Sequence, residues 1–185
     1  MNISKLVSER LETLGAKGPN QIDAVVLDSA QQPGFIVGVS IEEYNLGVSL
    51  TLQGYDRYSV TLRQLEVSHN VAAPAGNEID DKLRQWTEQI SQRLSYLEEP
   101  LTLLELDAEA KVAQLRSVSP HQDGEELTYW EAMVHAIPQP RVSLTRYYWS
   151  PDRSKREVAV YPVTFGTVSR IAQDIALCLL AQQAQ

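Results

Sequence analysis

Apolar residues recur at every second position through most of this chain, and this pattern constrains the fold more than any other feature. A period of two places alternate side chains on one face of an extended strand, so it predicts β-strands with one buried face. The pattern is clear in 46–53, where Val48, Leu50 and Leu52 alternate with other residues. The other predicted strands are 22–29, 35–41, 59–69, 101–108, 111–118, 127–137, 141–149 and 156–163.

One of these strands contains an irregularity. In 59–69 the apolar positions change phase, from even numbers up to Leu62 to odd numbers from Leu65 onward. One extra residue in a strand exchanges its two faces, so the change predicts a β-bulge near Arg63 or Gln64.

Three segments show helical spacing instead. In 3–14 the apolar residues lie three and four positions apart, and Gly15 is placed to end this helix. Asn77 is expected to cap a second helix that Pro100 stops, and Thr164 is expected to cap a third. The second and third helices are predicted near 77–97 and 165–180, with the stripes Ile79, Leu83, Trp86, Ile90, Leu94, Leu97 and Val168, Ile171, Ile175, Leu179.

The order of these elements predicts an α+β fold with two similar halves. Each half is an antiparallel β-meander followed by an amphipathic helix, and an N-terminal helix precedes the first. The halves, 1–99 and 100–185, are expected to form one compact domain. Both contain the word VSLT, at 48–51 and 142–145, which suggests an internal duplication.

Charge is unevenly spread along the chain. The net charge is −8, yet residues 132–185 carry six cations and three anions, against five cations and thirteen anions in 77–131. Nucleic-acid-binding proteins gain most of their affinity by neutralising phosphates, which requires a basic surface. The acidity therefore argues against a nucleic-acid partner. The basic and acidic regions are expected to face each other within the fold or across a dimer.

The sequence predicts neither a metal site, nor an intrachain disulfide, nor a membrane-spanning segment. Cys178 is the one cysteine, and His69, His121 and His135 are scattered without ligand spacing, so no cofactor is predicted. No apolar run approaches the roughly 20 residues of a membrane span, and the N-terminal residues do not resemble a signal peptide. These features together predict a cytoplasmic protein.

The main candidate binding segment is RYYWSPDRSKRE, residues 146–157, which is predicted to form a hairpin around a Ser-Pro-Asp turn. Arginine can hold a carboxylate or phosphate through two hydrogen bonds, and a neighbouring aromatic ring can stack beside the ligand. On a strand Arg146 and Tyr148 share one face, while Tyr147 and Trp149 share the other. The alternative is a hairpin whose charged tip is simply solvated. The candidate binding residues are Arg141, Arg146, Tyr148, Trp149, Arg153, Lys155 and Arg156.

No arrangement of residues predicts a reaction, so no catalytic residue is assigned. Glu131 and His135 share a strand face but lie about 13 Å apart on an extended chain, too far to touch. Cys178 sits between leucines in a predicted helix, where cysteine behaves as a small hydrophobe. The glycine-rich loops that bind phosphate are absent.

These observations favour a non-enzymatic protein-interaction or adaptor module, whose partner is another protein or a second copy of the chain. In size, charge and mix of elements the chain resembles the bacterial secretion chaperones, and this resemblance implies a chaperone-like role.

A second interpretation is a small-molecule or anion-binding domain, with or without catalysis. Its pocket would lie between the sheet and a helix, with Arg141, Arg146 and Arg156 as anchors. A buried arginine on strand 141–149 would favour it, because a buried charge needs a carboxylate or a ligand. A third interpretation is contact of the basic last third with RNA or DNA.

Overall fold

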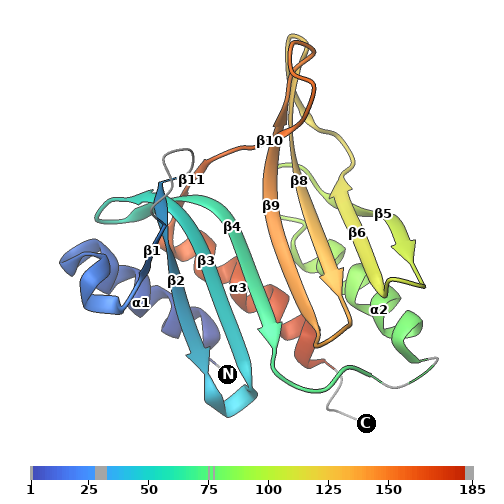
Figure 1. The fold of residues 1–185 in the computed structure, drawn as a ribbon, viewed down its shortest axis with the longest axis horizontal. Helices are drawn as coiled ribbons and strands as arrows, with labels where there is room; N and C mark the ends of the chain where they lie inside the picture. Colours follow the sequence, from blue (N-terminus) through green and yellow to red (C-terminus); the bar gives the residue numbers. More distant parts are fainter. Residues whose placement is uncertain (1, 28–32, 75, 77, 182–185) are drawn as a thin grey trace.

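The structure, a computed structural model, describes residues 2–27, 33–74, 76 and 78–181. In this part of the chain, three helices lie on one face of a large antiparallel sheet, which makes the protein an α+β fold (Figure 1). None of the described helices combines the length and the apolar composition that crossing a membrane requires.

The helices lie close to their predicted positions. They are α1 (Ile3–Lys17), α2 (Glu78–Arg93) and α3 (Phe165–Leu180). The predicted cap of α3 is confirmed, because the Thr164 side chain accepts a hydrogen bond from the backbone N–H of Thr167. The predicted cap of α2, Asn77, lies outside the described residues.

Two predicted helix ends are wrong. Gly15 lies inside α1, which continues to Lys17 and is capped by Gly18 with a φ of 82°. A Cβ atom at Gly15 would lie 2.9 Å from the carbonyl oxygen of Asp56, so glycine lets α1 pack closely against the turn that follows β3. α2 ends at Arg93 rather than near 97, although the next stripe residues, Leu94 and Leu97, are still buried.

Eleven strands in the described residues form the sheet. Two short 3-10 helices, Pro19–Ile22 and Glu42–Tyr44, lie between strands or helices of the N-terminal half. The strands are β1 (Val25–Leu27), β2 (Gly34–Ile41), β3 (Leu46–Tyr55), β4 (Ser59–His69), β5 (Leu101–Asp107), β6 (Val112–Ser117), β7 (His121–Asp123), β8 (Glu126–His135), β9 (Arg141–Trp149), β10 (Glu157–Val158) and β11 (Tyr161–Thr164).

Two further predictions need correction. The single strand expected over 156–163 is two short strands, because β10 pairs with β9 whereas β11 crosses over to pair with β4. Residues 119–126, for which no strand is predicted, contain β7, which pairs with β8 although it lacks the apolar alternation of a strand with a buried face. The end of the predicted strand 22–29 lies outside the described residues.

The main order of the strands is β1-β2-β3-β4-β9-β8-β6-β5. Antiparallel pairing of β4 with β9 joins the N-terminal and C-terminal meanders edge to edge into one sheet. The two VSLT segments flank β4 at the same register, since Val48 on β3 and Val142 on β9 both lie opposite Val67. The internal duplication itself stays a prediction.

The core lies between the sheet and the helix layer. Leu50, Leu65 and Leu144 of neighbouring strands are fully buried, as are Leu11 of α1 and Ile175 of α3. Burial of one such side chain contributes about 1.5–3 kcal/mol to the stability of the fold. The alternating residues of the strands and the apolar stripes of the helices are buried in the same interface, so both stabilise it. The buried apolar residues of the sheet and of the three helices form one cluster, whose first member is Ile3 in α1 and whose last is Leu179 in α3.

Candidate functional site

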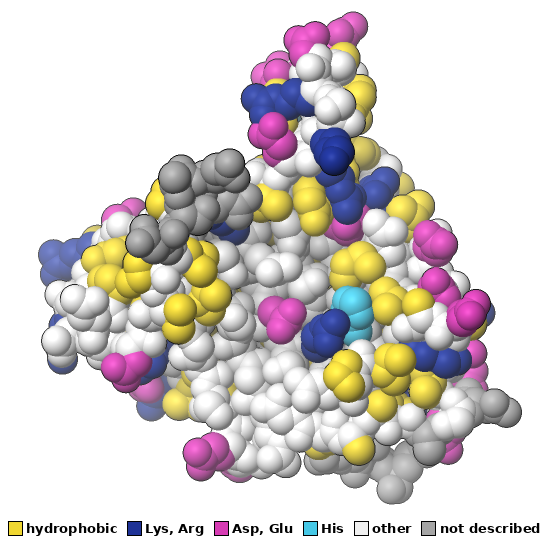
Figure 2. All heavy atoms as spheres, in the orientation of Figure 1, with side chains coloured by type: hydrophobic (Ala, Val, Ile, Leu, Met, Phe, Trp, Pro, Cys, Tyr) yellow, Lys and Arg dark blue, Asp and Glu magenta, His cyan; other side chains and the backbone are white. Residues whose placement is uncertain are grey.

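The face of the sheet opposite the helices carries no other element over most of its area in the described residues (Figure 1). Figure 2 views this face, and its centre, over β3, β4 and β9, consists mostly of backbone and uncharged polar side chains. Ser49, Thr51 and Ser143 contribute to this surface, because they alternate with the buried residues of β3 and β9, while Thr145 on the same face of β9 is 6% exposed. We call this surface the open face.

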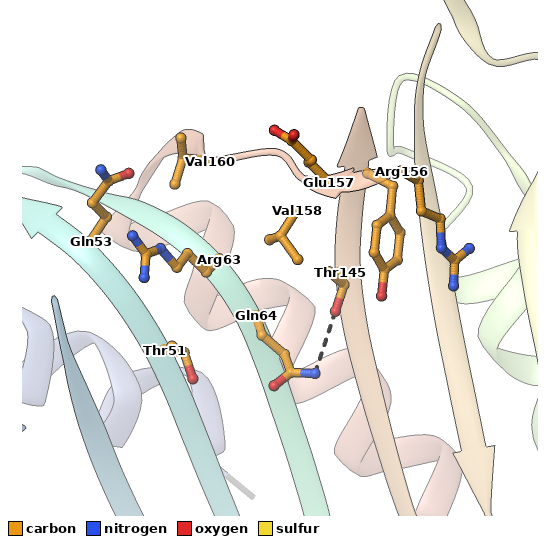
Figure 3. Close-up of a pocket in the computed structure, with 10 residues that line it drawn as sticks. Thr51, Gln53, Arg63, Gln64, Thr145, Arg156, Glu157, Val158 and Val160 are labelled. Atoms are coloured by element: carbon orange, nitrogen blue, oxygen red, sulfur yellow. Dashed lines mark hydrogen bonds between the residues drawn. The ribbon is translucent and has the colours of Figure 1, made fainter. Parts of the chain in front are cut away.

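A hollow of about 600 Å³ lies on the open face. β9 and β10 form a hairpin, and residues 156–160, which include β10 and lead to β11, pass along the upper side of the hollow (Figure 3). We call it the open-face hollow. Its lining comes from β3, β4, β9 and this segment: Thr51, Gln53, Arg63, Gln64, Thr145, Tyr147, Arg156, Glu157, Val158 and Val160.

Two β-bulges shape the floor of the hollow. Thr51 pairs with Gln64 and Leu52 pairs with Leu62, so Arg63 is an extra residue on β4, where the sequence predicted a bulge. Gln53 is the extra residue on β3, because the next pair after Leu52 involves Gly54. A bulge redirects side chains.

The bulge on β4 brings the consecutive residues Arg63 and Gln64 to the same hollow, which a regular strand would place on opposite faces (Figure 3). Thr51 and Thr145, the last residues of the two VSLT segments, lie opposite Gln64 on its two sides. The amide of Gln64 donates a long hydrogen bond of 3.4 Å to the Thr145 hydroxyl.

Arg63 carries the unbalanced charge of the hollow. Among the described residues no carboxylate forms an ion pair with it, and none of their groups forms a hydrogen bond with its buried Nη1 atom. The two other charged residues that line the hollow are engaged elsewhere, because Glu157 pairs with Arg153 and Arg156 pairs with Glu131. An unpaired, partly buried guanidinium favours an anionic ligand.

A charged cluster on β6 and β8 adjoins the hollow beyond Tyr147. The Glu131 side chain is 3% exposed, and its carboxylate accepts hydrogen bonds from Gln114 at 2.6 Å, Arg116 at 3.0 Å and Arg156 at 2.5 and 2.9 Å. Burial alone would raise the pKa of Glu131, but these donors outweigh it and hold the pKa below its ordinary value. As a carboxylate, Glu131 therefore anchors Arg156, the first residue of the 156–160 segment, to the sheet.

Aromatic rings hold the arginines of this cluster in place. The guanidinium of Arg156 lies 4.0 Å from the ring centre of Tyr147, and that of Arg116 lies 5.0 Å from the ring centre of Tyr129. The two rings are 5.9 Å apart. Stacking and cation–π attraction make Tyr147 a rigid wall between the hollow and the Glu131 cluster.

Arg146 points to the opposite, helix-covered face. Its side chain is 8% exposed, donates to Glu99 Oε1 at 2.9 Å and lies 4.6 Å from the ring centre of Tyr161. Burial raises the pKa of Glu99, and the charge of Arg146 offsets part of that rise. Strand 141–149 thus contains a buried arginine, but a carboxylate of the same chain pairs with it, so its burial does not require a ligand.

The structure does not bring the seven predicted binding residues together. Arg146 and Arg156 lie on opposite faces of the sheet, and of the seven only Arg156 lines the open-face hollow. Arg141 begins β9 opposite His135, whose pKa is lowered by burial and by the charge of Arg141. The remaining four lie on the hairpin that β9 and β10 form: Tyr148, Trp149, Arg153 and Lys155.

Two of these hairpin residues contact each other, since the Arg153 guanidinium lies 5.3 Å from the ring centre of Tyr148. Sequence reasoning missed Arg63, Gln64 and Gln53 as site residues. The change of hydrophobic phase at Arg63 was the available signal, because a bulge in a strand with one open face turns an extra side chain toward solvent.

The described residues therefore form a two-layer α+β fold, with the core between the sheet and the helices and a polar, recessed surface on the other side of the sheet. Comparison with protein-family models, curated proteins and solved structures found no match to this chain.

Proposed function

We propose that the protein is a non-enzymatic interaction module, of the adaptor or chaperone-like kind, that binds an extended segment of a partner protein across the open face. The observation that carries the proposal is the position of the open-face hollow, on the helix-free side of the sheet rather than between sheet and helices. Threonine and glutamine side chains there can donate and accept hydrogen bonds, as the backbone of a peptide requires. Val158 and Val160 add apolar contacts at the upper side.

The chemistry of the neighbouring residues supports binding rather than catalysis. Glu131, the most buried carboxylate near the hollow, is occupied by three donor side chains. A carboxylate with a lowered pKa and few free lone pairs is a weak general base. Cys178 lies buried in the helix layer, and burial raises the pKa of its thiol to about 12, which makes it a poor nucleophile. The single cysteine of the chain also supports a cytoplasmic location.

A peptide selection tests this proposal. Random dodecapeptides displayed on phage are selected on the wild-type protein, and the enriched peptides are synthesised for affinity measurements. The variant Ser143→Trp places a large neutral side chain on the open face, and Gln92→Trp places the same side chain on the exposed surface of α2 as a control. We expect the selected peptides to bind Ser143→Trp at least about tenfold more weakly, and Gln92→Trp as tightly as the wild type. Selected peptides that bind Ser143→Trp with unchanged affinity contradict the proposal.

Self-association through β5 is a second candidate. β5 is the last strand of the main sheet order, and Leu103 and Leu104 on it are 39% and 53% exposed. An exposed edge strand with apolar side chains can pair with the same edge of another copy. Light scattering after size exclusion is expected to report a dimer that Leu104→Lys converts to a monomer. A wild-type protein that stays monomeric at high concentration contradicts it.

A further inference from the structure

The open-face hollow has one charge that no described residue balances. Arg63 lies beside Gln53 at one end of the hollow, and Gln64 with Thr145 lies at the other (Figure 3). Val158 lies between these ends in the same view. The lining thus combines one cation that has no ion pair among the described residues, Arg63, with two paired charged residues and several neutral hydrogen-bonding groups.

The bulge on β4 lets both Arg63 and Gln64 face the hollow. In a regular strand that continued the alternation of the buried Leu62, Arg63 would face the open side and Gln64 would turn toward the helix layer. A bulge interrupts the hydrogen-bond ladder of a strand, so it reduces stability unless another interaction offsets the loss. The Nη1 atom of Arg63, which is buried without a partner among the described residues, adds a second cost. An anionic ligand that neutralises the charge of Arg63 offsets part of these costs.

The balance of charge selects the kind of ligand. The other two charged residues that line the hollow, Arg156 and Glu157, are each neutralised by an ion pair. One uncompensated positive charge matches one monoanionic group, and the carboxylate of Glu157 close by disfavours a dianion such as phosphate. The fork of an arginine fits a carboxylate through two parallel hydrogen bonds.

We propose that Arg63 is a carboxylate-binding residue, which takes either an acidic side chain or the free C-terminus of the bound partner segment. This inference rests on the proposed function, since it names the group that the open face recognises in its partner. Gln53, Gln64 and Thr51 then bind the polar backbone next to the carboxylate, and Val158 contacts its methylene groups.

Four small probes test the inference without knowledge of the partner. N-acetyl-glutamate N-methylamide offers a side-chain carboxylate, N-acetyl-glutamine offers a terminal carboxylate, N-acetyl-glutamine N-methylamide offers neither, and inorganic phosphate offers a dianion. Each is titrated into ¹⁵N-labelled protein at constant ionic strength, and amide chemical shifts are followed. We expect saturable shifts at the residues that line the hollow with one or both carboxylate probes, and none with the neutral amide. Which carboxylate probe binds identifies the source of the carboxylate.

Three variants assign the binding to Arg63. Arg63→Gln is expected to weaken carboxylate binding at least about fivefold, and Arg63→Lys to give an intermediate loss because lysine keeps the charge without the fork. Arg57→Gln removes an exposed arginine of the β3–β4 turn and is expected to bind like the wild type. The dispersion of amide signals shows that each variant is folded. Equal binding by Arg63→Gln, equal shifts with the neutral amide, or tighter binding of phosphate overturns the inference.

The two proposals fail in different ways. If selected peptides bind the open face but tolerate Arg63→Gln, the interaction module stands and the carboxylate site is wrong. If the carboxylate probes bind at Arg63 while no peptide is selected, the carboxylate site stands and the interaction module is wrong.

Discussion

Replacement of Glu131 by glutamine tests how the 156–160 segment is held to the sheet. The Glu131 side chain is 3% exposed, while those of its partners Arg116 and Arg156 are 35% and 36% exposed. The substitution keeps the shape of the side chain but removes its charge and replaces one acceptor oxygen with a donor. That donor then faces the guanidinium groups and the amide of Gln114.

The expected cost follows from the exposure of the partners. A hydrogen bond to a charged group contributes about 1.5–3 kcal/mol when it is buried. Both arginines reach solvent, which screens the attraction and lets them rehydrate once the carboxylate is gone, so the total for three partners is well below the sum. We expect Glu131→Gln to lower the free energy of unfolding by about 2 kcal/mol, and the melting temperature by about 4–8 °C.

Urea unfolding followed by tryptophan fluorescence measures this difference as a function of pH. The folded-state pKa of Glu131 is lowered, so its stabilisation is fully present above the unfolded pKa of about 4.3 and is lost as the pH falls through the folded pKa. The gap between wild type and Glu131→Gln should therefore be constant near neutral pH and close in acid. As a control, Glu157→Gln removes the exposed pair with Arg153 and should change stability little. A gap below about 0.5 kcal/mol at pH 7, or one that persists unchanged to pH 3, refutes this reasoning.

Three other measurements check the remaining structure. Arg146→Ala should lower the free energy of unfolding by about 3–5 kcal/mol in urea titrations, because it leaves the buried Glu99 without its cation; a loss below about 1 kcal/mol contradicts the buried pair. Thr164→Ala should cost about 1 kcal/mol by removing the cap of α3, while Thr164→Ser should restore it; equal stability of both variants contradicts the cap. Cys178, whose pKa is raised to about 12 by burial, should react with a thiol reagent at pH 8 only after unfolding in urea, and rapid reaction of the native protein contradicts its burial.

Much of the secondary structure could be predicted from the chain because it depends on local patterns. The alternation in β3 and the stripe of α3 each place apolar groups on one face, whatever the neighbouring elements are. The bulge at Arg63 was predictable for the same reason, since an extra residue changes the phase of the alternation within a single strand. Elements without such a pattern, such as β7 and the divided strand over 156–163, were missed.

The candidate site was largely beyond prediction from sequence, because its members come from strands far apart in the chain. Periodicity placed Arg146 and Tyr147 on opposite faces of β9, but it did not say which face the helices cover. The covered face is decided by packing, and it buries Arg146 against Glu99 while leaving Tyr147 beside the hollow. The sequence did not predict the partner of Arg156 either, because Glu131 lies 25 residues earlier on another strand.

By itself the sequence determined where most strands and helices form, which of their residues share a face, and where β4 is irregular, because each of these depends on hydrophobic periodicity within one segment. Tertiary structure alone decided that β4 pairs with β9, and this one pairing sets Gln64 between the threonines of the two VSLT segments and builds the hollow that holds Arg63. Strand pairing is non-local, since many edges offer the same backbone hydrogen bonds and only the packing of the whole sheet against its helices selects among them.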